Sequence, residues 1–97
     1  MTTTNLLRLL NSIGKSTFVR YYDQFADLRL SHEHVVATLP ESYTLKSRNS
    51  RATHARRIFR EGLQEEALEL ILHAEGVDDK TRCGASDRLD RIRATRS

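Results

Sequence analysis

Residues 18–25 have the sequence FVRYYDQF, and this stretch decides the fold. Its four aromatic side chains stand at i, i+3, i+4 and i+7, which places them on one stripe of an α-helix. The pattern predicts a helix over residues 16–28. Core packing is a more common role for such a stripe than stacking on nucleic-acid bases, so we expect it to form the aromatic centre of a hydrophobic core. The four rings are those of Phe18, Tyr21, Tyr22 and Phe25.

Other segments also have helical patterns, and none alternates with the period of two that marks a strand. Thr4 and Ser31 are suited to cap helices, while Gly14, Pro40 and Gly62 are suited to end them. The sequence therefore predicts an all-α fold, a small bundle of four to five short helices. Besides the aromatic helix, the expected segments are about 4–11, 31–39, 45–61 and 64–75.

The end of the chain has a different composition. Residues 78–97 hold few apolar side chains, so little buried surface offsets the entropy lost when the segment becomes ordered. We therefore expect a single helical domain over 1–77, followed by a flexible, mobile basic tail over 78–97.

Composition limits the class of protein. The chain has 97 residues, of which 38% are hydrophobic and 30% charged, enough apolar content for one small core. Its one cysteine, Cys83, cannot form an intramolecular disulfide, which predicts a reducing, cytoplasmic location. No segment approaches the roughly 18 apolar residues of a membrane span, and the first residues lack a secretory signal pattern. We expect no membrane partner.

The formal net charge of +3 hides a separation of charge along the chain. Residues 46–60 contain six Lys or Arg and no acid, whereas residues 61–79 contain seven acids and no Lys or Arg. Residues 80–97 are basic again, and residues 1–45 are neutral overall. An acid-free basic block of this kind is typical of contact with nucleic acid.

The predicted helix over 45–61 is the candidate nucleic-acid site. Its outward half is expected to hold arginines, which neutralise phosphates, together with Asn and Thr side chains, which can hydrogen-bond to base edges. The tail's Arg88, Arg91, Arg93 and Arg96 would extend the electrostatic reach. The candidate contacts are Arg48, Asn49, Arg51, Thr53, Arg56, Arg57 and Arg60.

Three interpretations of the basic block stand side by side. With the helix over 31–39 it forms a helix-turn-helix-like pair that binds DNA in preference to RNA, although the connection over 40–44 is long for that motif and lacks its glycine. Alternatively, the basic strip 46–60 pairs with the acidic strip 61–79 of its own chain and is simply a solvated helix. The third interpretation is a protein-interaction module or homodimer, in which these strips meet between chains.

The remaining short motifs predict little chemistry. Gly14-Lys-Ser-Thr17 matches the end of a phosphate-binding loop, but Leu9 stands where that loop requires a glycine. His32 and His34 point apart on a helix, and the other histidines are dispersed, so no metal site is expected. No nucleophile is paired with a base. We therefore expect a protein that is not an enzyme, with no cofactor and no small-molecule substrate.

Overall fold

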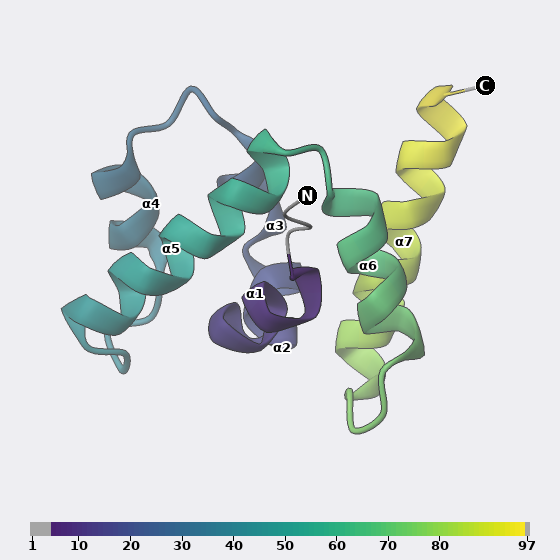
Figure 1. The fold of residues 1–97 in the computed structure, drawn as a ribbon, viewed down its shortest axis with the longest axis horizontal. Helices are drawn as coiled ribbons and strands as arrows, with labels where there is room; N and C mark the ends of the chain where they lie inside the picture. Colours follow the sequence, from purple (N-terminus) through teal and green to yellow (C-terminus); the bar gives the residue numbers. More distant parts are fainter. Residues whose placement is uncertain (1–4, 97) are drawn as a thin grey trace.

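The computed structural model describes residues 5–96 and, up to residue 95, their side chains. Over this range the protein is all-helical, as predicted, and contains no strand. It has seven helices where four to five were expected (Figure 1). They are α1 (Leu6–Ile13), α2 (Lys15–Arg20), α3 (Tyr22–Ala26), α4 (His32–Thr38), α5 (Leu45–Arg60), α6 (Gln64–His73) and α7 (Asp79–Arg96).

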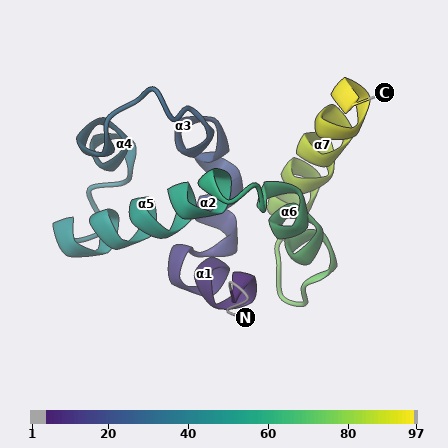
Figure 2. The same cartoon turned by 45° about the horizontal axis from the view of Figure 1, so that its top comes forward.

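The helices form two pairs on either side of a central group. α4 and α5 lie at one end of the molecule, α6 and α7 lie side by side at the other, and α1 to α3 fill the space between them (Figures 1 and 2). α5 packs against α1, α3 and α4, while α7 packs against α6 and α2. The longest helices, α5 and α7, therefore flank a common core.

Two of the seven helices come from the segment that was predicted to be one. The predicted helix over 16–28 is broken at Tyr21, whose φ of −108° and ψ of 23° lie outside the α-helical region. The Tyr21 amide still donates to the Thr17 carbonyl, and its own carbonyl accepts from the Phe25 amide. The break is a kink at a single residue, and a kink of this kind leaves the aromatic spacing nearly unchanged.

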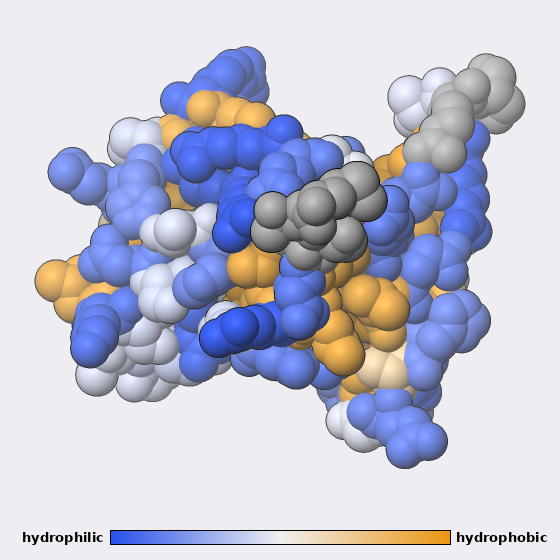
Figure 3. All heavy atoms as spheres, viewed as in Figure 1, coloured by the Kyte–Doolittle hydropathy of each residue, from blue (hydrophilic) through white to orange (hydrophobic). Residues whose placement is uncertain are grey.

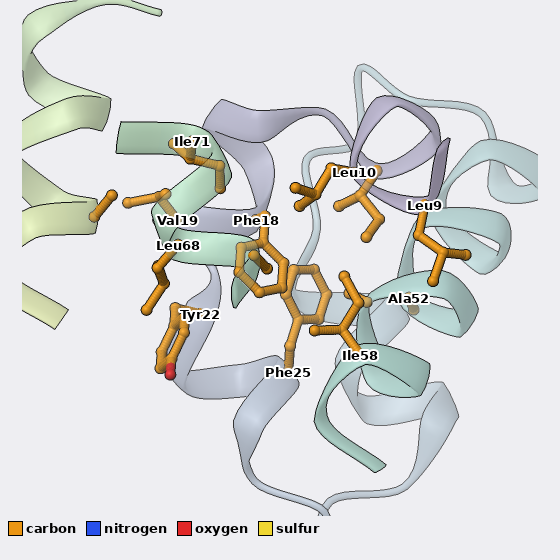
Figure 4. Packing of buried hydrophobic residues seen from close by; sticks show 14 of the residues in the cluster. Leu9, Leu10, Phe18, Val19, Tyr22, Phe25, Ala52, Ile58, Leu68 and Ile71 are labelled. Carbon is orange, nitrogen blue, oxygen red and sulfur yellow. The ribbon is translucent and has the colours of Figure 1, made fainter. Parts of the chain in front are cut away.

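The aromatic stripe supplies the core, as predicted. Phe18, Tyr22 and Phe25 are buried, and Tyr21 is partly buried against them. Phe59 of α5 joins this group: its ring stacks on Phe18 at a centroid distance of 5.6 Å and meets Tyr22 edge-on at 5.0 Å. Figure 4 shows Phe18 and Phe25 side by side, with Ile58 of α5 next to them. The aromatic cluster thus fixes α5 to α2 and α3.

Most of the segment 78–97, which was predicted to be a mobile tail, is helical in the structure, because α7 runs over Asp79–Arg96. Thr81, Ala85 and Leu89 are buried, and Ile92 packs against the core. These residues are spaced at i, i+4, i+8 and i+11, so they share one narrow face of the helix. About one buried side chain per turn is enough to hold α7 in place, because α2 and α6 together form the surface on which it packs.

Local start and stop signals act largely as predicted. The Ser31 side chain accepts a hydrogen bond from the His34 amide at the start of α4. Gly62 adopts a left-handed φ of 69° between α5 and α6, a conformation that a residue with a Cβ rarely reaches. Asn5 caps α1 through the Arg8 amide, and the predicted cap, Thr4, lies outside the described residues. The two caps mark the starts of α1 and α4, and Gly62 separates α5 from α6.

Candidate nucleic-acid interface

α5 begins and packs in a way that leaves one face open. The Thr44 side chain accepts from the Ser47 amide and caps the helix. Ala52, Ala55 and Ile58 are fully buried on the inner face, where the two alanines let α5 approach its neighbours closely. Because successive residues of a helix are about 100° apart, burial of this inner face determines which residues lie on the opposite, outer face.

Five residues make up that opposite face, and we call them the outer stripe of α5. All five are exposed, and they fall within an arc of about 80° on the helix. Three are cations and two bear hydroxyl groups, so the stripe holds no acid. It consists of Lys46, Ser50, Thr53, Arg57 and Arg60.

Most of the outer stripe is unoccupied by other side chains. Within residues 5–95, whose side chains the structure describes, those of Lys46, Thr53 and Arg60 make no hydrogen bond or ion pair. Arg57 donates from Nε to Glu61 Oε2 at 2.5 Å, but the Arg57 side chain is 56% exposed. An exposed pair of this kind contributes roughly 0–1 kcal/mol, so a phosphate can compete for the guanidinium.

Arg56, which was predicted to point outward, is buried. Its side chain is 4% exposed, and Nη2 donates to the carbonyls of Leu30 at 2.7 Å and Leu28 at 3.4 Å. Its Nε is buried without a hydrogen-bond partner among the described residues. Arg56 therefore holds the α3–α4 connection against α5 and is withdrawn from any phosphate.

Arg51 also has a structural role. Its Nη1 donates to the Ile13 carbonyl at the end of α1, its Nε donates to Ser47 Oγ at 3.0 Å, and its guanidinium lies 4.0 Å from the centre of the Tyr43 ring. The Tyr43 hydroxyl in turn is 3.1 Å from Thr17 Oγ1. These contacts tie the first half of α5 to the junction between α1 and α2.

Arg48 and Asn49 flank the stripe without belonging to it. Arg48 is half-buried, and its Nε has no hydrogen-bond partner among the described residues. Asn49 donates from Nδ2 to the Leu45 carbonyl, and its Oδ1 lies 2.8 Å from His32 Nε2. Both groups of the Asn49 amide are thus engaged within the protein.

The structure brings together only three of the seven predicted contacts, namely Thr53, Arg57 and Arg60, on the outer stripe. Lys46 and Ser50 also belong to the stripe, and neither was among the seven predicted contacts, although Ser50 was expected on the outward half of the helix. Their spacing gave the signal, since counting back from Arg57 in steps of four, three and four residues passes through Thr53 and reaches both.

The acidic helix pairs with α7 and leaves most of the basic helix alone. Arg93 of α7 forms ion pairs with Glu65, at 3.4 Å, and with Glu69 of α6. Hydrogen bonding to the Glu69 carboxylate raises the pKa of the Arg93 guanidinium above its usual value. Within residues 5–95, Arg57 is the α5 arginine with an ion pair, to Glu61 at the helix end. Glu61 belongs to the end of α5 and not to α6, so no ion pair within residues 5–95 joins an α5 arginine to the acidic helix.

The tail arginines are likewise paired. Arg88 binds Asp23 at 2.7 Å and Arg91 binds Asp87 at 3.0 Å, in addition to the Arg93 pairs. The expected electrostatic reach of a loose basic tail is thus reduced by carboxylates of α3 and α6 and by Asp87 of α7 itself. The side chain of Arg96 lies outside the described part.

Asp78 at the start of α7 predicts a dependence of stability on pH. Hydrogen bonds from the Thr81 hydroxyl and amide hold the pKa of the Asp78 carboxyl below its usual value. A lowered pKa in the folded state stabilises the fold above the unfolded pKa, and this contribution is lost as pH falls through the folded value. We expect Asp78→Asn to lower Tm at pH 7 and to weaken the fall in Tm between pH 5 and pH 3, measured by circular dichroism.

Asp90→Asn is the matched control, because Asp90 is exposed on the same helix and makes no hydrogen bond or ion pair within the described residues. It should retain the wild-type Tm and pH profile. An Asp78→Asn protein with the wild-type profile would contradict the capping role.

Comparisons of the chain with protein-family models, curated proteins and solved structures found no match. Among the described residues, no helix has both the length and the apolar content needed to cross a membrane. No cluster of three or more His, Cys, Asp or Glu side chains suited to a metal ion occurs in that part of the chain either. Figure 3 shows mostly hydrophilic side chains over α5, with an apolar group at its start, and apolar side chains over α1 and α6. The exposed leucines of these three helices are Leu45, Leu7 and Leu70.

Proposed function

We propose that this is a non-enzymatic, cytoplasmic protein that binds duplex DNA through the outer stripe of α5. The single supporting observation is the stripe itself: three exposed cations and two hydroxyls on one face of a helix whose other face is anchored in the core. The cations neutralise phosphates with release of counterions, and the hydroxyls hydrogen-bond to phosphates or base edges.

The dimensions of α5 suit a DNA groove. Lys46 and Arg60 are separated by fourteen residues, hence by about 21 Å along the helix axis. An α-helix is about 10–12 Å across with its side chains, close to the width of the DNA major groove, whereas the major groove of A-form RNA is too narrow to admit it. In this proposal α4 and α5, joined by residues 39–44, act as a helix-turn-helix-like pair in which α4 crosses the backbone.

Titration with duplex DNA at 50 and 200 mM salt tests the proposal. Three neutralised phosphates predict a slope of about −2.7 for log K against log salt, hence a loss of about 40-fold in affinity over this range. Lys46→Ala and Arg60→Ala should each reduce the slope by about 0.9, measured by fluorescence anisotropy.

Arg91→Ala is the matched control, because Arg91 is exposed on α7 and far along the chain from the stripe. It should leave the slope unchanged. Absence of binding at 50 mM salt, or an unchanged slope in the Lys46→Ala and Arg60→Ala double variant, would refute the proposal. Binding to duplex RNA as tight as to DNA would refute the groove assignment.

Assembly between copies is the alternative function, and the same sample tests it. Exposed acids that have no partner within residues 5–96, such as Glu66 and Glu75, could face the outer stripe of a second chain. Sedimentation should show a monomer that binds DNA. A tight dimer that fails to bind DNA would favour assembly instead.

A further inference from the structure

A hollow in the surface lies between α2 and the start of α7, and no residue of the outer stripe of α5 lines it. Its volume is about 400 Å³, within the range of small-molecule sites. A smaller hollow of about 220 Å³ adjoins it, sharing Ser16, Asp78 and Thr81 and extending to Lys15 and to Glu75. The two together form one depression along the α2–α7 contact.

The floor of the larger hollow is shaped by a missing side chain. Gly84 faces Val19, and a Cβ on Gly84 would lie only 2.6 Å from Val19 Cγ1. Thr81, which is 6% exposed, completes the floor. Because α7 can approach α2 closely at this point, residues on both helices reach the same small volume.

The rim of the hollow is positively charged. Arg20 is exposed and makes no ion pair within residues 5–96, and Lys80 is likewise exposed and unpaired there. Arg88 is held in place by Asp23 at 2.7 Å and by the Tyr22 ring, whose centre is 4.8 Å from the guanidinium carbon. Two unpaired cations, Arg20 and Lys80, and one arginine that is paired with Asp23 therefore surround the opening.

The one acid that lines the larger hollow is already engaged. The Asp78 carboxylate accepts hydrogen bonds from the hydroxyl and the amide of Thr81 at the start of α7. It occupies the helix amide that an incoming anion would otherwise use, so side-chain cations must supply the attraction. The Ser16 hydroxyl is exposed at the edge and makes no hydrogen bond among the described residues.

We propose that this hollow binds the phosphate group of a small phosphomonoester, held by Arg20, Lys80 and Arg88 with Ser16 as a hydroxyl donor. Guanidinium and ammonium groups form strong charge-assisted hydrogen bonds to phosphate oxygens, and a fixed arginine such as Arg88 is already oriented for them. The site is concave and of bounded volume, which suits a small dianion better than the convex backbone of a duplex. It adds a ligand class that the sequence did not indicate.

An amide NMR titration of the full chain tests this site. Inorganic phosphate should shift the amides of Ser16, Thr81 and Gly84 and saturate at millimolar concentration, and adenosine 5′-monophosphate should shift the same amides while adenosine does not. Arg20→Ala and Lys80→Ala should each weaken binding by about fivefold. Both residues are exposed, so the variants should fold. The dispersion of amide shifts in the same spectra shows whether they do.

Arg91→Ala is the control, because Arg91 lies on α7 outside the hollow, and it should bind as wild type does. The proposal is overturned if the shifts spread evenly over all basic residues, if the Arg20→Ala and Lys80→Ala double variant binds unchanged, or if adenosine binds as well as its monophosphate. A duplex without 5′-phosphates that moves these amides at lower concentration than phosphate would reassign the hollow to the DNA backbone. None of these outcomes depends on whether Lys46 and Arg60 contact DNA.

Discussion

Arg56→Met is expected to destabilise the protein by about 2 kcal/mol, because it leaves two backbone carbonyls without their donor. The methionine can fill much of the space, but it cannot donate to the Leu28 and Leu30 carbonyls, which receive no other hydrogen bond from the described residues. For a domain of this size, Tm should fall by roughly 8–16 °C in a thermal melt.

The neighbouring Arg57→Met variant separates this effect from a general loss of charge. Arg57 loses only an exposed pair with Glu61, so Tm should change by a few degrees at most. Equal Tm values for the two variants would show that Arg56 does not hold the α3–α4 connection. For DNA binding we expect the opposite ranking. At temperatures where both variants are folded, Arg57→Met should weaken DNA binding more than Arg56→Met does.

Gly84→Ala is expected to destabilise the protein by about 1–3 kcal/mol even though alanine favours helices over glycine by about 1 kcal/mol. The added methyl would stand 2.6 Å from Val19 Cγ1, so α7 must move away from α2 or Val19 must be displaced from the core. Denaturant unfolding should show a lower midpoint, and the packing of Ala85 and Leu89 should loosen.

Cys83→Ala is the control, since Cys83 is exposed one position earlier on the same helix and should change the midpoint little. Val19→Ala in the Gly84→Ala protein should recover part of the loss, because the shortened side chain makes room for the methyl. The double variant should thus be more stable than the sum of the two single changes, by about 0.5–3 kcal/mol. Strict additivity would show that the two side chains do not meet.

Helices with strong local signals could be predicted from the sequence. Ser31 supplies a side-chain acceptor at the start of α4, and Gly62 supplies the one residue type that turns left-handed without strain. The aromatic spacing from Phe18 to Phe25 correctly predicted three buried rings, and the fourth, Tyr21, is partly buried. It could not show the kink at Tyr21, because a change in one ψ angle alters the direction of the chain and hardly alters the pattern.

The helical state of α7 and the burial of Arg56 could not be predicted from the sequence, because both depend on contacts between distant segments. The face with Ala85 and Leu89 is too sparse to predict a buried helix until α2 and α6 are known to cover it. Angles on an isolated helix placed Arg56 outside, but the connection after α3 covers that side of α5 and offers carbonyl groups. The direction of a long arginine side chain depends on where hydrogen-bond acceptors lie, and the angular position of the residue on its helix does not give that information.

The contact of α7 with α2 and α6 limits where the chain can be shortened. A chain shortened to its first 77 residues would lose the surface that faces Val19 and the neighbouring part of α6. Those aliphatic side chains would be left in contact with water, where they would invite aggregation. A fragment for expression should therefore run at least through Ile92, the last of the described side chains that packs against the core.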